Sequence, residues 1–168
     1  VTARRPGGIR RRRLPGGLPV IDQIDFLVGV WRGEGRGDYP TIDAFTYTEE
    51  VTFGTIPTKD FVTYRQATKG ADGLPLHTES GYVRSPARGI GEFVIAQQTG
   101  VTEILTGVVE GTTLDLTSTT VGLTPSAKTI RSTARLIEVD GDVLRYRMTM
   151  AAMNQPEQFH LEAELHRV

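Results

Sequence analysis

Few side chains in this sequence have the type and spacing that metal binding or nucleophilic catalysis requires. There are three histidines, His77, His160 and His166, and no cysteine. The lack of cysteine excludes disulfides, thiolate metal ligands, iron–sulfur clusters and cysteine nucleophiles. The histidines show neither H-x-H nor H-x-x-x-H spacing, so we do not expect a dedicated zinc site.

Other common catalytic patterns are also missing from the sequence. There is no G-x-S-x-G elbow for a serine nucleophile and no glycine-rich phosphate loop leading into a helix. Glu49 and Glu50 are adjacent. Neighbouring side chains of a strand point to opposite faces, so these two do not form a convincing acid–base pair. Because no set of side chains is recognisably catalytic, any reactivity is expected to come from a bound cofactor.

The elements that must position these residues are predicted to be short strands. Ten segments of mostly alternating polarity follow residue 29, and turn residues separate them. Compact hairpin signals occur at Gln98–Gly100, Glu110-Gly111 and Asp140-Gly141. The expected strands are 30–38, 44–53, 61–68, 77–84, 91–97, 101–109, 113–119, 128–138, 142–153 and 159–167.

This pattern favours an all-β fold, either a sandwich or an up-and-down barrel. No segment is long and periodic enough to be a crossover helix. Sequential hairpins favour a ten-stranded antiparallel barrel, since closure removes exposed strand edges. Residues 19–28 space their apolar side chains as one or two helical turns would. A barrel of this size predicts a cavity but not its contents.

Charge divides the chain into two parts. The sequence has 19 basic and 20 acidic residues, and six of the arginines lie between Arg4 and Arg13. We expect residues 1–18 to be a disordered basic tail and residues 19–168 to be one acidic barrel domain. An acidic barrel argues against nucleic-acid binding, and no apolar stretch is long enough for a membrane helix. A domain without cysteine fits the cytoplasm.

A glycine-rich motif, G-x-W-x-G-x-G, opens the first strand at Gly29, Trp31, Gly33 and Gly35. Alternation places Trp31, Gly33 and Gly35 on one face. A lone tryptophan at the start of a barrel commonly plugs one end, and glycines relieve crowding where the strand bends. The motif is therefore expected to pack the barrel base, and it can also lie next to a ligand.

These motifs, in this order, resemble the nitrobindin family of haem-binding barrels, whose fold is similar to that of lipocalins and fatty-acid-binding proteins. The resemblance extends over about 29–167. The matching stretches are GVWRGEGRGDYPTI at 29–42, FTYTEEVTF at 45–53, PLHTESGYVR at 75–84, TGVTEILTG at 99–107, PSAKTI at 125–130 and HLEAELHR at 160–167.

The resemblance implies a site and an activity. The family's histidine at the start of the last strand is the axial ligand of a b-type haem iron, and here it is His160. Thr41, Lys128 and Met150 stand at positions that contact haem in the family. The family is also described as peroxynitrite isomerases, so the resemblance implies that ferric haem converts peroxynitrite to nitrate and can bind nitric oxide. His77 and His166 are interpreted as structural or surface residues.

Two features of the sequence depart from this picture. Thr55 stands where the family often has a histidine, so the distal side of the pocket is expected to be less polar or differently closed. Strand parity also places His160 on the opposite face from Phe159, Leu161 and the apolar residues that follow. Either the strand bends or bulges after Pro156, or the polar set faces the lumen.

The alternative function is a carrier of haem, a fatty acid or another apolar ligand. Such a site usually needs a fixed cation for a carboxylate. The chain has four arginines in alternating strands that either supply this cation or form an exposed face: Arg131, Arg135, Arg145 and Arg147. The sequence leaves open whether the protein is a monomer or a homodimer.

Overall fold

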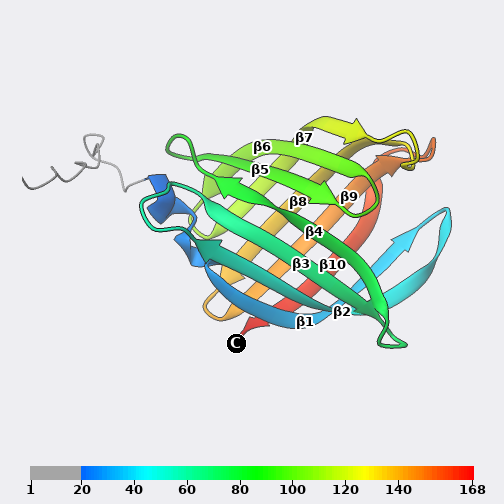
Figure 1. Cartoon of the computed structure of the whole chain (residues 1–168), viewed down its shortest axis with the longest axis horizontal. Helices are drawn as coiled ribbons and strands as arrows, with labels where there is room; N and C mark the ends of the chain where they lie inside the picture. Colours follow the sequence, from blue (N-terminus) through cyan, green and yellow to red (C-terminus); the bar gives the residue numbers. More distant parts are fainter. Residues whose placement is uncertain (1–19) are drawn as a thin grey trace, which may run out of the picture.

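Ten antiparallel strands form a single closed barrel in the computed structural model, which describes residues 20–168. Each strand pairs with its neighbours in sequence, and β1 pairs with β10 to close the sheet (Figure 1). The strands are β1 (Gly29–Tyr39), β2 (Ile42–Thr55), β3 (Val62–Gly70), β4 (Pro75–Arg84), β5 (Ile90–Gln97), β6 (Val101–Glu110), β7 (Thr113–Leu123), β8 (Ile130–Asp140), β9 (Val143–Ala152) and β10 (Gln158–Arg167).

The predicted barrel and its hairpins are confirmed. Gly100, Gly111 and Gly141 each adopt a positive φ in the turns where the sequence placed them. Only glycine enters this region of backbone space without steric cost, so these positions fix the turns. The expected helical segment is present as two short 3-10 helices, η1 (Val20–Gln23) and η2 (Asp25–Leu27).

One end of the barrel, called here the closed end, is plugged by these helices (Figure 1). Trp31 is fully buried there, and its indole N–H donates to the carbonyl of Leu27 at 2.8 Å. The guanidinium of Arg167 lies 4.0 Å from the centre of the Trp31 ring. Apolar side chains from all ten strands, including Phe53, Phe93 and Leu165, fill the same region.

The other end, called here the mouth, carries the loops β1–β2, β3–β4, β5–β6, β7–β8 and β9–β10 (Figure 1). Strand pairing is irregular at several places toward the mouth, including shifts in β3 and β6. The register shifts between Gly37 and Tyr39 in β1, between Ile130 and Ser132 in β8, and between Phe159 and Leu161 in β10. Such bulges are enriched at barrel rims and beside functional sites because they re-aim side chains.

The glycines of β1 leave room for side chains that cross the strand on its inner side. A Cβ atom at Gly35 would overlap the Tyr47 ring. A Cβ atom at Gly37 would overlap the ring of Phe45 and a methyl group of Leu161. The glycine motif of β1 therefore allows close packing on the inner side of the strand, and Trp31 of the same motif packs at the closed end.

The predicted basic tail at 1–18 lies outside the described residues. Among residues 20–168, no helix is both long enough and apolar enough to cross a membrane.

Candidate functional site

His160 turns toward the lumen because of the bulge in β10. Phe159 pairs with Thr149 and Leu161 with Met148, so His160 is the additional residue in its strand. Leu161 packs against the core, and the ring of Phe159 lies between two exposed arginines. A bulge after Pro156, one of the two alternatives that the sequence left open, is therefore confirmed, and strict parity does not hold between Phe159 and Leu161. The bulge interrupts the alternation, which sends Phe159 outward and leaves both His160 and Leu161 inward.

The imidazole of His160 packs against an aromatic side chain at the mouth of the barrel. Its ring packs edge-on against Tyr39, with 5.4 Å between centroids and 74° between planes. Within the described residues, its Nδ1 atom is buried and has no hydrogen-bond partner. Burial lowers the pKa of His160 below its ordinary value. A polar contact with the Asp38 backbone partly offsets this decrease, and electrostatic interactions with Arg135 and His77 add to it. His160 is thus neutral near pH 7, which is the state in which imidazole binds metals.

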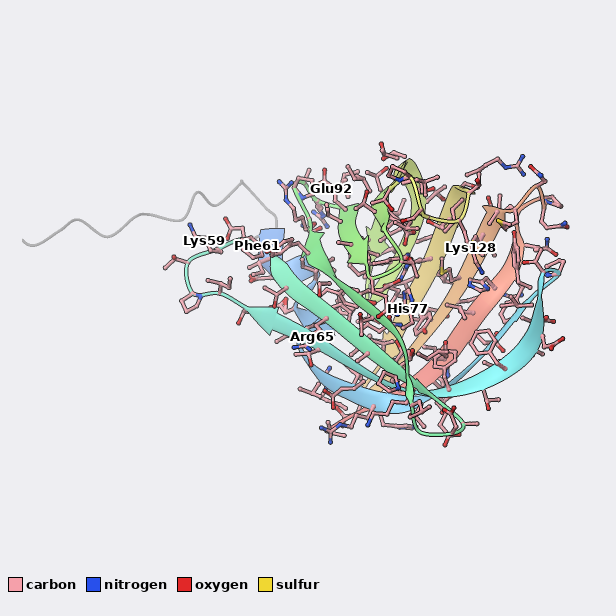
Figure 2. The ribbon with its side chains drawn as sticks, turned by 45° about the vertical axis from the view of Figure 1, so that its right-hand side comes forward. Lys59, Phe61, Arg65, His77, Glu92 and Lys128 are labelled. Carbon is pink, nitrogen blue, oxygen red and sulfur yellow. The ribbon has the colours of Figure 1, made fainter. Side chains whose placement is uncertain are left out.

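The other expected haem contacts lie at the same end of the barrel. Met150 is buried on β9, in register with Gln158, and its carbonyl accepts a hydrogen bond from Tyr39. Thr41 is exposed in the β1–β2 turn, and Lys128 is exposed in the β7–β8 loop. Figure 2 shows Lys128 close to the mouth.

Thr55 lies at the opposite end. It ends β2 and pairs with Val62, two residues beyond the pairing of Phe53 with Gly29. Gly37, which pairs with Leu161, is eight residues further along β1, or roughly 26 Å away at about 3.3 Å per residue. The hypothesis that Thr55 shapes the pocket around His160 is therefore not supported by its position.

A charged layer crosses the middle of the lumen, between the closed end and the mouth. Arg135 is 5% exposed and donates to Glu79 through both terminal nitrogens, each at 2.9 Å. One of these nitrogens also bonds Glu103 at 2.9 Å. Gln97 and Thr133 donate to the same Glu103 carboxylate. Desolvation opposes ionisation of Glu79, but the Arg135 charge and hydrogen bonds hold the pKa of Glu79 well below its usual value.

A second carboxylate belongs to the same layer. Glu49 accepts hydrogen bonds from Gln66 at 2.7 Å and Tyr146 at 2.8 Å, and the hydroxyl of Tyr146 also contacts that of Tyr47 at 2.8 Å. Burial raises the pKa of Glu49 to about 7 despite these two bonds. A small cavity of about 20 Å³ lies beside Glu49, Arg135 and Tyr146, so side chains fill almost all of the lumen at this level.

Of the four arginines considered as anchors for an apolar carboxylate, only Arg135 faces the lumen. The other three are exposed. Because Arg135 already binds two carboxylates, it does not offer a free cation to a fatty acid. Sequence parity carried a signal for its position, since Arg135 alternates with the buried Ile137 and Val139.

His77 lies inside the barrel and not on its surface (Figure 2). Its side chain is 26% exposed, and its Nε2 atom lies 3.4 Å from Glu79. The interpretation of His77 as a structural residue fits this contact with the charged layer. His166, by contrast, is exposed near Glu164 on the outer face of β10.

The donor set at the mouth fits a haem ligand site. It consists of one imidazole with a buried Nδ1 atom, next to the aromatic ring of Tyr39, which itself clusters with Met150. A closed β-barrel with a histidine directed inward at its mouth has the architecture of the haem-binding barrel proteins.

Comparison with known proteins identifies the family. Residues 20–167 match the family model of the THAP4-like, heme-binding beta-barrel domain, so the chain belongs to this family, which is the nitrobindin family expected from the sequence. It is 48% identical over 154 residues to "Peroxynitrite isomerase 1" of Mycolicibacterium paratuberculosis, covering 89% of this chain and 95% of that one. It is 42% identical to "Peroxynitrite isomerase" of Nocardia farcinica, covering 89% and 91%.

A solved structure supports the same assignment. The crystal structure of Rv2717c from M. tuberculosis superposes with a TM-score of 0.83 at 42% sequence identity. The match covers 90% of this chain and 98% of that chain. The similarity therefore extends over the whole barrel, including the strand that carries His160.

Proposed function

We propose that this protein binds one haem b through His160 and isomerises peroxynitrite to nitrate. The observation that carries the proposal is the inward direction of the His160 imidazole, which the β10 bulge sets and which packs against Tyr39. Family membership and the curated relatives named peroxynitrite isomerases support the activity.

Several residues at the mouth would hold the cofactor, each through a different kind of contact. His160 would ligate the haem iron, because burial lowers the pKa of its imidazole and so favours the neutral form. Met150 would supply an apolar, adaptable contact, and the exposed Thr41 and Lys128 would bind haem propionates. When bound, ferric haem would supply the chemistry that converts peroxynitrite to nitrate.

Nitric oxide is proposed as a second small ligand of the same position. Nucleic acid and membranes are not proposed as partners, because the barrel domain is acidic. The cytoplasm remains the predicted compartment, and a monomer or a homodimer is compatible with the site because His160 and its neighbours come from one chain.

The proposal is tested by adding haemin to the wild type, His160→Ala and His166→Ala. His166 is the matched control, since it belongs to the same strand but is exposed outside the barrel. We expect a Soret band at one haem per chain in the wild type and in His166→Ala, and its loss in His160→Ala. An unchanged spectrum in His160→Ala would rule out the ligand assignment.

The reaction is tested by stopped-flow decay of peroxynitrite with the ferric holoprotein. We expect faster decay and a higher nitrate yield than with the apo form. If holoprotein and apoprotein give the same rate while haem binding persists, the protein is a haem carrier and the isomerase proposal fails.

A further inference from the structure

The orientation of His160 depends on a choice between two arrangements of β10. In a regular strand, Phe159 would share the inner face with Leu161, and His160 would point to solvent. The observed bulge reverses both residues. Because burial of a phenylalanine is favourable, something in the structure must hold the bulged arrangement.

Inside the barrel, Tyr39 holds the imidazole. Its ring contacts that of His160, and its hydroxyl lies 3.2 Å from the carbonyls of both Met150 and Ala152. The same hydroxyl accepts a hydrogen bond from the Ala152 amide at 2.8 Å. Tyr39 thus ties the end of β1 to the end of β9, with His160 of β10 packed against it.

Outside the barrel, two cations hold the ring of Phe159. The guanidinium of Arg36, on β1, lies 5.3 Å from the ring centre, and that of Arg147, on β9, lies 5.1 Å from it. Arg36 also donates to Glu162 at 2.6 Å. The stack spans the three strands that surround the bulge, and it gives Phe159 a favourable place on the outer face.

We propose that Tyr39 and the Arg36–Phe159–Arg147 stack are positioning residues that hold the β10 bulge and so keep His160 directed into the lumen. The consequence for haem rests on the proposed function, while the effect on the orientation of His160 does not. None of the three stack residues is placed at the haem contacts, so they act only through the strand.

The stack is tested with the double variant Arg36→Gln/Arg147→Gln, which keeps Phe159 but removes both cations. The matched control is Arg32→Gln/Arg145→Gln. Its two arginines lie on the same strands, are exposed, and pair with Glu50 and Glu164. The control therefore makes the same change of charge and breaks two surface ion pairs without touching Phe159, whereas the test variant breaks the one ion pair of Arg36 with Glu162.

The first readout uses the apoprotein. Diethyl pyrocarbonate modifies accessible, neutral imidazoles, and mass spectrometry reports each histidine separately. We expect the rate at His160 to rise at least fivefold relative to exposed His166 in the test variant and to stay within twofold in the control. Equal rates in test and control variants would overturn the proposal for the stack.

The second readout is haem dissociation. Losing two exposed cation–π contacts is expected to speed haem loss by about tenfold, with no comparable change in the control. If the wild type binds no haem, or His160→Ala binds it equally well, the proposed function fails. The modification rates of the apoprotein still decide whether the stack holds the bulge.

The inner contact is tested with Tyr39→Leu and Tyr39→Phe, each checked for a cooperative melting transition. Tyr39→Leu removes the ring that packs on His160, so it should raise the modification rate of His160 at least fivefold. Tyr39→Phe keeps the ring and should affect that rate less than Tyr39→Leu does. If both variants fold and neither changes the rate, Tyr39 has no positioning role.

Discussion

The two ends of the barrel are made from the same ten strands, but they differ in regularity and in chemistry. At the closed end, β1 and β2 pair without interruption from Gly29 to Gly37, and Trp31 is buried among apolar side chains. At the mouth, the register shifts near Tyr39, Ile130 and His160. The comparison indicates that stability is concentrated at the regular end, while the irregular end is shaped to aim particular side chains.

The charged layer separates these two ends. Its buried groups are satisfied mainly by one another, as in the contacts of Arg135 with Glu79 and Glu103. Buried ion pairs of this kind contribute little net stability but are costly to break. The layer therefore separates the apolar side chains of the closed end from the site at the mouth.

The largest expected effect comes from truncating the plug. Trp31→Ala removes the largest fully buried side chain and its bond to Leu27, and should lower the free energy of unfolding by about 3–5 kcal/mol. Denaturant unfolding of the apoprotein measures this. A loss below about 1 kcal/mol would contradict the assignment of stability to the closed end.

A loss of about 3 kcal/mol or more is expected from Arg135→Met, because two buried carboxylates lose their shared cation. Protonation would relieve those carboxylates, so the defect should shrink as the pH falls toward 5. Unfolding curves at pH 5 and pH 8 measure this change. A defect that is independent of pH would show that Arg135 acts through packing and not through charge.

A smaller effect is expected from Glu49→Gln. The pKa of Glu49 is raised from 4.5 to about 7 in the folded state. Its contribution to stability is thus fully present below about pH 4.5 and is lost as the pH rises through 7. Relative to the wild type, the variant should gain about 2–3 kcal/mol in unfolding free energy between pH 5 and pH 8. A parallel pH dependence in both proteins would contradict the raised pKa.

The smallest effect is expected from Thr55→His. This change introduces the histidine that the resemblance to the family implied at this position, but the position lies at the closed end, remote from His160. The haem dissociation rate should stay within about twofold of wild type, since no contact with the mouth is made. A change of tenfold or more would show that the closed end communicates with the haem site.

The regular part of the barrel could be predicted from the sequence. Alternating polarity and turn glycines such as Gly111 and Gly141 indicated all ten strands, with limits within about two residues of those observed except at the end of β7, which extends four residues further, to Leu123. These signals are local, because alternation and positive φ depend on neighbouring residues. The glycine motif likewise indicated that Trp31 would plug an end of the barrel.

The positions of the buried charges could not be predicted with the same ease. The sequence offered Arg135 as one of four equivalent arginines, and only closure of the barrel shows that it meets Glu79 and Glu103 across the lumen. Those partners are 56 and 32 residues away, respectively. Contacts across a lumen depend on strand register and tilt, which no local pattern encodes.

The sequence by itself determined the fold, the family and the identity of His160 as the candidate ligand, because ordered motifs and alternation need no knowledge of contacts. Only the tertiary structure decided the direction of His160. Simple parity turned it outward, while the bulge between Phe159 and Leu161 turns it inward. The physical reason is that a bulge adds one residue against a partner strand. Its place is set by contacts from β1 and β9, through Tyr39, Arg36 and Arg147, which meet β10 only once the barrel has closed.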